Sequence, residues 1–121
     1  MKIAICTTGA SMDSKLDKRF GRTESFIIYD NETKEIKHID NTAKQETSGA
    51  GGTAVRLIND HGAEVVITNE VGPKAKDALK AFEIKAYGIG DCETAQEAID
   101  SFADGKLSEL SLEKPSGLRR A

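Results

Sequence analysis

The chain has 121 residues, enough for one hydrophobic core but too few for two domains of ordinary size. Its 17 basic and 20 acidic residues give a formal net charge of −3, so the positive charge expected of a general nucleic-acid-binding protein is missing. A hydrophobic share of 38% and a charged share of 31% are typical of a globular protein rather than a disordered or fibrous one.

The amino-terminal sequence enters a predicted strand without a signal peptide. Met1 is followed directly by Lys-Ile-Ala-Ile, and no apolar run in the chain approaches the length needed to span a bilayer. We therefore predict a cytoplasmic protein without a membrane partner. The two cysteines, Cys6 and Cys92, form no C-x-x-C unit, so neither a disulfide framework nor a zinc ribbon is indicated.

The first part of the chain predicts three strands. Residues 2–8 combine β-branched isoleucines with smaller residues and form the first, which ends in a long loop over residues 9–22. Residues 25–29 and 35–39 form the next two strands. The polar turn over residues 30–33 joins them as a hairpin, which makes the pair antiparallel.

The rest of the chain alternates helices with strands. Apolar residues recur at the i, i+3, i+4, i+7 spacing that gives a helix one buried face, and Thr94 with Glu97 has the form of a capping box. The predicted elements are a helix over 54–61, a strand over 64–68, a helix over 73–82, a strand over 84–87 and a helix over 95–102.

The predicted order is therefore β-β-β-α-β-α-β-α. Helical crossovers join the last two strands to the sheet, which requires parallel neighbours and right-handed connections. We predict a single α/β domain with a mixed five-stranded sheet and flanking helices. The sequence from Lys106 onward lacks a clear period, so we expect a domain over residues 1–110 and a flexible tail over residues 111–121.

Three polar, glycine-containing stretches predict a site for an anion. Residues 7–22, 48–53 and 69–73 follow strands or precede helices, and ligands of open α/β sheets gather at the carboxyl ends of the parallel strands. Glycines let backbone N–H groups approach a ligand, helix starts add partial positive charge, and a guanidinium adds paired donors. The predicted anion-binding residues are Arg22, Ser48, Gly49, Gly51, Gly52 and Gly72. The alternative interpretation of the glycines is a flexible connection, and they match neither the Walker A nor the dinucleotide-binding pattern.

The two cysteines are candidate metal ligands. Cys6 lies near the end of the first strand and Cys92 in the turn before the last helix, and thiolates are the preferred protein ligands of iron-sulfur units. The alternative is that each is a small buried apolar residue. Two thiols cannot supply the four protein ligands of an ordinary cluster, so any cluster would be shared, partly self-ligated or bound non-covalently.

The order of several motifs resembles the dinitrogenase iron-molybdenum cofactor biosynthesis family, which includes the NifX and NafY types and the C-terminal part of NifB. The motifs are MKIAI at the start, Asp17-x-x-Phe20-Gly21-Arg22, the glycines of 49–52, Val65-Val66-Ile67-Thr68, Gly72-Pro73 before a helix, and Ile84-Lys85-Ala86-Tyr87. The resemblance covers residues 1 to about 110. It implies a ribonuclease H-like fold. It also implies binding, carriage or storage of the iron-molybdenum cofactor or its iron-sulfur precursor during nitrogenase assembly, with cluster donor and acceptor proteins as partners.

One position departs from the family pattern, and two other functions stay open. Many relatives have a histidine just before the glycines, whereas this chain has Thr47-Ser48, and a serine hydroxyl is a poor ligand for iron. We predict a carrier rather than an enzyme. The alternatives are a regulatory or interaction module that binds a small anion or a partner protein without metal, and a metal-dependent phosphodiester hydrolase. The predicted strands are poor in the carboxylates that such a hydrolase needs.

Overall fold

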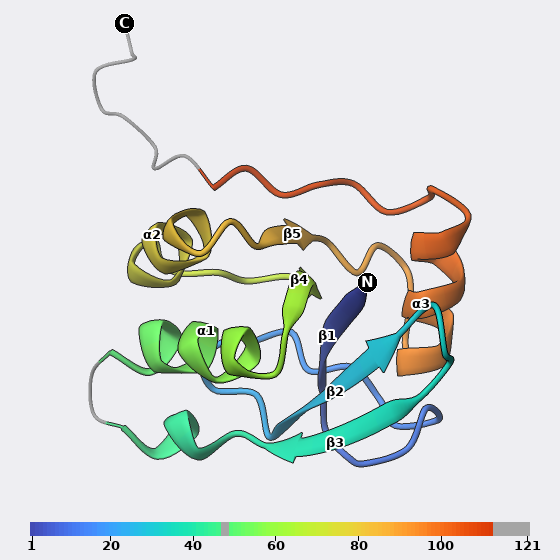
Figure 1. The fold of residues 1–121 in the computed structure, drawn as a ribbon, viewed down its shortest axis with the longest axis horizontal. Coiled ribbons are helices and arrows are strands. Elements are labelled where there is room, and N and C mark those ends of the chain that lie inside the picture. The colour runs from blue at the N-terminus through green and yellow to red at the C-terminus, as the bar shows by residue number, and fades with distance from the viewer. Residues whose placement is uncertain (47–48, 113–121) are drawn as a thin grey trace, which may run out of the picture.

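The computed structural model describes residues 1–46 and 49–112. These residues form β1 (Lys2–Thr7), β2 (Ser25–Asp30), β3 (Ile36–Asp40), the 3-10 helix η1 (Thr42–Gln45), α1 (Ala50–Asp60), β4 (Ala63–Ile67), α2 (Pro73–Ala81), β5 (Lys85–Tyr87) and α3 (Ala95–Ala103) (Figure 1). The predicted order of strands and α-helices is confirmed, and η1 is an addition to it. Within the described ranges, no helix has the length and apolar character needed to cross a membrane.

The strands form one mixed sheet in the order β3-β2-β1-β4-β5. The β2–β3 hairpin adds to β1 in antiparallel fashion, and β4 and β5 continue on the other side of β1 as parallel strands. The carboxyl ends of β1, β4 and β5 therefore lie at the same edge of the sheet. The loops after β1 and β4 leave from this edge, and α1 and α2 begin there.

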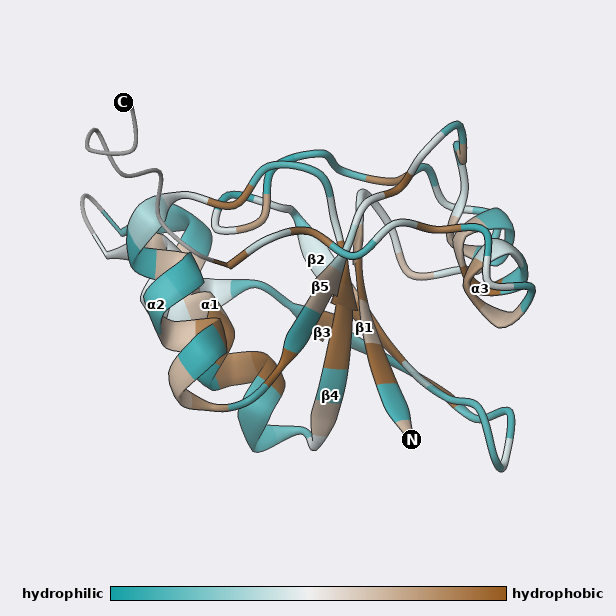
Figure 2. Cartoon of the chain, turned by 90° about the horizontal axis from the view of Figure 1, so that it is seen from above, coloured by the Kyte–Doolittle hydropathy of each residue, from teal (hydrophilic) through white to brown (hydrophobic). Residues whose placement is uncertain are grey.

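The two faces of the sheet carry separate helices. Figure 2 shows α1 and α2 on one face and α3 on the other. The alternation of β1 produces this division, because Ala4 and Cys6 pack under α1 and α2 while Ile3 and Ile5 pack under α3. Both faces of the central strands are thus buried, as the apolar run in β4 predicts.

The long loop after β1 is anchored by Phe20. This side chain is only 1% exposed and packs against Phe26 with 5.7 Å between ring centroids. Its backbone N–H donates to the carbonyl of Glu70 at 3.2 Å, and the N–H of Glu70 donates to the carbonyl of Lys18 at 2.9 Å. The loop after β1 is thereby joined to the loop after β4, which fixes the position of the turn that follows Phe20.

The segment after α3 returns to the sheet along β5. The N–H of Gly88 donates to the carbonyl of Ser108, and the N–H of Leu110 donates to the carbonyl of Ala86. Leu112 packs against the core on the α1 and α2 face. The predicted tail begins within this ordered segment, and residues 113–121 lie outside the described part of the chain.

Candidate functional site

A hollow of about 460 Å³ lies where the starts of α1 and α2 meet the turn after Phe20. We call it the glycine hollow; it is lined by Gly21, Arg22, Gly49, Ala50, Gly51, Gly72, Pro73, Lys74 and Ala75. The loop after β1, the start of α1 and the start of α2 are three segments distant in sequence. The structure brings them to one surface, as expected for segments at the carboxyl ends of neighbouring strands.

Two glycines allow these segments to approach closely. A Cβ atom on Gly21 would lie 2.9 Å from the backbone nitrogen and 3.0 Å from the Cα of Gly51, and a Cβ on Gly51 would lie 2.8 Å from the Cβ of Ala75. A side chain at either position would force the segments apart. The glycines thus allow the turn after Phe20 and the starts of α1 and α2 to lie in direct contact.

Both helix starts lack the side-chain caps that usually satisfy their first N–H groups. Gly49 and Gly72 occupy the two N-cap positions, and neither helix has an acidic residue in its first turn. Gly49 adopts a left-handed conformation with φ 76°, which favours glycine. Among the described residues, the amides of Lys74 and Ala75 have no acceptor. The walls of the hollow therefore present open donors and the positive ends of two helix dipoles.

Arg22 and Lys74 add positive charge to the hollow. Nη1 of Arg22 donates to the carbonyls of Lys44 at 2.8 Å and Glu46 at 2.6 Å. Its Nε and Nη2 donate to nothing within the described ranges. The described lining has these two cationic side chains and no carboxylate, so its electrostatic potential favours an anion.

Asp17, the nearby acid of the sequence motif, is neutralised within its own loop. It accepts hydrogen bonds from the backbone N–H, Nε and Nη2 of Arg19 and from the N–H of Glu24. Burial alone would raise the pKa of Asp17, but these hydrogen bonds and the Arg19 charge outweigh it and lower the pKa. The carboxylate stays ionised and paired with Arg19, and it orders the turn that carries Arg22.

Four of the six predicted anion-binding residues line the glycine hollow, and two do not. Arg22, Gly49, Gly51 and Gly72 belong to the lining. Gly52 lies in the first turn of α1 but outside the lining, and a Cβ there would meet nothing within 4 Å. The remaining residue, at position 48, lies outside the described residues.

The two cysteines lie on opposite faces of the sheet. Cys6 is 1% exposed in the core beneath α1 and α2, and burial raises the pKa of its thiol to about 12. Cys92 packs on the α3 side, where its Sγ lies 3.4 Å from Oγ of Ser101. The structure therefore does not bring the two thiols together or place either in the lining of the glycine hollow. Within the described ranges, no group of three or more His, Cys, Asp and Glu side chains is arranged to hold a metal ion.

Lys74 is a residue of the site that was not among the predicted anion-binding residues. Lys74 directly follows Gly72-Pro73, so its position in the first helical turn beside an exposed N-terminus was the available signal. The signal is weak, because a single lysine on a helix usually lies on the solvated face of the helix.

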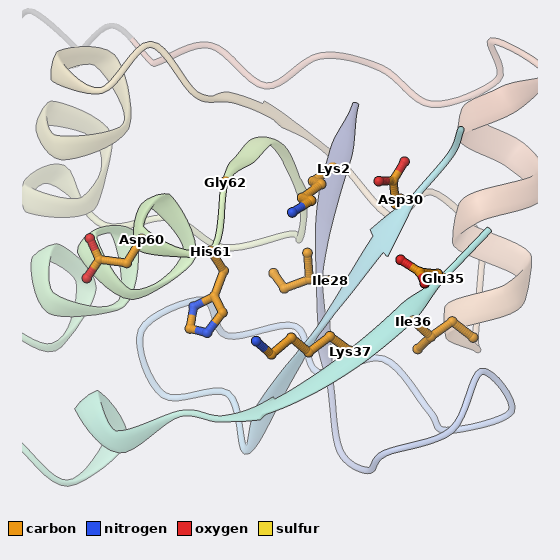
Figure 3. A pocket seen from close by; sticks show the side chains of 9 residues that line it. All are labelled: Lys2, Ile28, Asp30, Glu35, Ile36, Lys37, Asp60, His61 and Gly62. Carbon is orange, nitrogen blue, oxygen red and sulfur yellow. The ribbon is translucent and has the colours of Figure 1, made fainter. Parts of the chain in front are cut away.

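A second and larger hollow, of about 680 Å³, lies at the opposite end of the sheet, where β1 and β4 begin (Figure 3). We call it the hairpin hollow; it is lined by Lys2, Ile28, Asp30, Glu35, Ile36, Lys37, Asp60, His61 and Gly62. Figure 3 shows the side chains of Lys2, Lys37 and His61 arranged around Ile28. Three carboxylates accompany the two lysines, and the negative end of α1 lies there, so this hollow has no comparable preference for anions.

Comparison with known proteins identifies the family. The model of the dinitrogenase iron-molybdenum cofactor family matches residues 1–105. The chain belongs to this family. An uncharacterized protein of Methanocaldococcus jannaschii is 33% identical over 114 residues, which covers 91% of this chain and 96% of the relative.

Two solved structures share the fold and the family resemblance. The apo form of the orange protein from Desulfovibrio gigas is 33% identical and superposes with a TM-score of 0.87, covering 91% of this chain and 92% of that one. A Thermotoga protein assigned to NifB is 37% identical with a TM-score of 0.79, covering 89% of this chain and 91% of that one. The predicted α/β class and the family resemblance are thus confirmed.

Proposed function

We propose that this chain binds an anionic metal–sulfur cluster in the glycine hollow and carries it between a donor and an acceptor protein in the cytoplasm. The cargo is the iron-molybdenum cofactor, an iron-sulfur precursor or a related cluster. Membership of the family supports a role in handling such clusters. The relation to the orange protein, which has an apo form, supports a bound cofactor or ligand.

The meeting of two uncapped helix starts with Arg22 is the observation that carries this proposal. A cluster with several negative charges and sulfur atoms on its surface accepts hydrogen bonds from backbone N–H groups. The glycine hollow offers such donors in a space of about 460 Å³. Arg22 and Lys74 add electrostatic attraction at longer range.

The placement of the cysteines supports binding without a protein thiolate. The Cys6 thiol is buried with its pKa raised to about 12, so its metal-binding thiolate form is disfavoured near neutral pH. Cys92 faces the α3 side of the sheet. We propose that the metal atoms keep their own sulfur ligands and that the chain contacts the outside of the cluster. Such binding suits a carrier, because release then breaks no metal–protein bond.

A metal-free anion is the second candidate for the same site. The described lining combines N–H donors and cations and contains no thiol or imidazole, which equally suits a phosphate or sulfate group. The chain would then act as a regulatory or interaction module. The two candidate functions predict different preferred ligands: a metal–sulfur anion for the carrier, and phosphate or sulfate for the regulatory module.

An anaerobic titration with tetrathiomolybdate, a molybdenum–sulfur dianion with characteristic absorbance, tests the proposal. We expect saturable binding that resists excess phosphate. Arg22→Gln and Lys74→Gln should each weaken it by about tenfold, the effect of losing one charge-assisted hydrogen bond. Lys37→Gln, which removes a lysine from the hairpin hollow, is the matched control and should leave the affinity unchanged.

Two further results would separate the candidates. A variant in which both cysteines are replaced by alanine should still bind tetrathiomolybdate if no protein thiolate is needed. Displacement by equimolar phosphate would favour the metal-free alternative. Loss of binding in the Lys37→Gln variant, with Arg22→Gln unaffected, would refute the glycine hollow as the site.

A further inference from the structure

Asn41 is a buried polar residue whose side chain serves the turn around Arg22. It is 0% exposed and lies just before η1. Its Nδ2 donates to the carbonyl of Gly21 at 3.1 Å and to the carbonyl of Thr23 at 2.9 Å. These are the residues on either side of Arg22, so one amide group fixes both ends of the peptide segment that carries the guanidinium.

The same residue also orders the segment that receives Arg22. Its Oδ1 accepts the N–H of Ala43 at 3.1 Å and begins the turn of η1. That turn presents the carbonyls of Lys44 and Glu46, to which Nη1 of Arg22 donates. Asn41 therefore fixes the backbone on both sides of Arg22, and the side chain of Arg22 in turn fixes the end of the η1 segment.

The hydrogen bonds made by Asn41 and Arg22 determine which N–H donors of Arg22 remain available for a ligand. Both hydrogens of Nη1 point to backbone carbonyls, so the guanidinium plane is fixed while Nε and Nη2 stay without acceptors among the described residues. A guanidinium fixed in this way loses little rotamer freedom when it binds an anion. Without Asn41, the turn and the η1 segment would lose their shared anchor and Arg22 would sample many orientations.

We infer that Asn41 is a positioning residue for the glycine hollow and acts on the bound anion through Arg22. The inference rests on the proposed function, because it assigns Asn41 to the same anion site. Asn41 contributes to affinity without touching the ligand. Within the described residues, the hydrogen bonds of its buried side-chain amide all go to the backbone around Arg22 and η1. The amide therefore positions that backbone.

A double-mutant cycle on tetrathiomolybdate affinity tests the inference. Asn41→Ser keeps a hydroxyl that can accept the N–H of Ala43 but cannot reach both carbonyls beside Arg22. We expect Asn41→Ser to weaken binding about threefold to tenfold in the wild-type background, the effect of about one hydrogen bond. In the Arg22→Gln background the same substitution should have no further effect. Equal losses in both backgrounds, or no loss in either, would overturn the positioning role.

Two further measurements check that the variants are folded and that the guanidinium of Arg22 is fixed. Circular dichroism establishes that each variant is folded, and Asn41→Thr, which fills more of the same space, replaces Asn41→Ser if the latter unfolds. In the wild-type protein, nitrogen-15 NMR should show separate, slowly exchanging Nη1 and Nη2 signals for Arg22; rapid averaging would overturn the inference without any variant. Failure of the wild-type protein to bind tetrathiomolybdate would instead refute the proposed function, and the positioning role with it.

Discussion

The start of α3 differs from the starts of α1 and α2 in how its backbone N–H groups are satisfied. Oγ1 of Thr94 accepts the N–H of Glu97 at 3.2 Å, and Oε1 of Glu97 accepts the N–H of Glu93 at 2.8 Å. The loop after β1 adds two carbonyls, which accept the N–H groups of Ala95 and Gln96. The first-turn donors of α3 are therefore satisfied, whereas glycine occupies the N-cap positions of α1 and α2 and supplies no side-chain cap.

This difference shows which helix starts serve folding and which are available for a ligand. A side-chain cap contributes about 1 kcal/mol to stability. At α3 the cap and the loop carbonyls together satisfy the N–H groups of the first turn, which leaves none of them for an anion. Two open starts side by side forgo that stability and keep their donors. All three helices begin at the carboxyl edge of the sheet, so their position alone does not select the glycine hollow; the chemistry of the first turn does.

Adding a Cβ to Gly21 is expected to have the largest effect, because it pushes the turn that carries Arg22 away from the open start of α1. In Gly21→Ala the new atom would meet the backbone of Gly51 at 2.9 Å. We expect a loss of about 1–3 kcal/mol in the free energy of unfolding, measured by urea denaturation, with loss of tetrathiomolybdate binding. Gly52→Ala is the control, because nothing lies within 4 Å of its Cβ. It should stabilise α1 by about 0.5–1 kcal/mol and keep the binding.

Closing the start of α2 should remove binding without harming the fold. Gly72 has φ −73° and ψ 170°, which other residues adopt, and a Cβ there meets nothing within 4 Å. Gly72→Asp would cap the first turn and place a negative charge at the hollow, so affinity should fall by at least tenfold, or about 1.4 kcal/mol. The melting temperature should stay the same or rise. Gly72→Asn caps without charge and Gly72→Ala does neither, so their affinities separate occlusion of the donors from repulsion.

The buried thiol beneath the open starts should make stability fall at alkaline pH. The pKa of Cys6 rises from an ordinary 9.0 to about 12, so the unfolded chain loses this proton first. The contribution of the protonated thiol to the free energy of unfolding is complete below pH 9 and declines between pH 9 and 12, by roughly 1 kcal/mol for each pH unit above 9. Urea unfolding at pH 8 and pH 10 measures it. Cys6→Ala should remove this part of the slope and Cys92→Ala should keep it; equal slopes in both variants would contradict the assignment.

Sequence alone was sufficient to predict the fold and the meeting of the three segments. The 3.6-residue and two-residue periods predict helices and strands because each element buries one stripe, and the crossover rule then brings the carboxyl ends of β1 and β4 to one edge. Arg22, Gly49, Gly51 and Gly72 followed from this rule, and the structure places them together.

Features that depend on contacts between distant segments could not be predicted. Cys6 and Cys92 were both predicted as candidate metal ligands, but the face of the sheet that each thiol occupies is set by the packing of three helices on its two sides. Asn41 gave no signal, because its partners Gly21 and Thr23 lie about twenty residues earlier and become neighbours only through the pairing of β2 with β3. Local sequence patterns predict helices and strands. The faces of the two cysteines and the partners of Asn41 depend instead on the register of the sheet and on the packing of the helices against it.

Removal of the α3 cap should have the smallest effect and no consequence for the site. Thr94→Ala takes away the acceptor of the Glu97 N–H, so the free energy of unfolding should fall by about 1 kcal/mol. The affinity for tetrathiomolybdate should stay at the wild-type value, because α3 packs on the opposite face of the sheet from α1 and α2. Urea denaturation and an anaerobic titration on the same preparation measure both quantities. A variant that lost affinity in proportion to stability would show that binding follows global stability rather than the open helix starts. Unchanged affinity at lower stability would instead assign stability to the start of α3 and binding to the starts of α1 and α2 on the other face of the sheet.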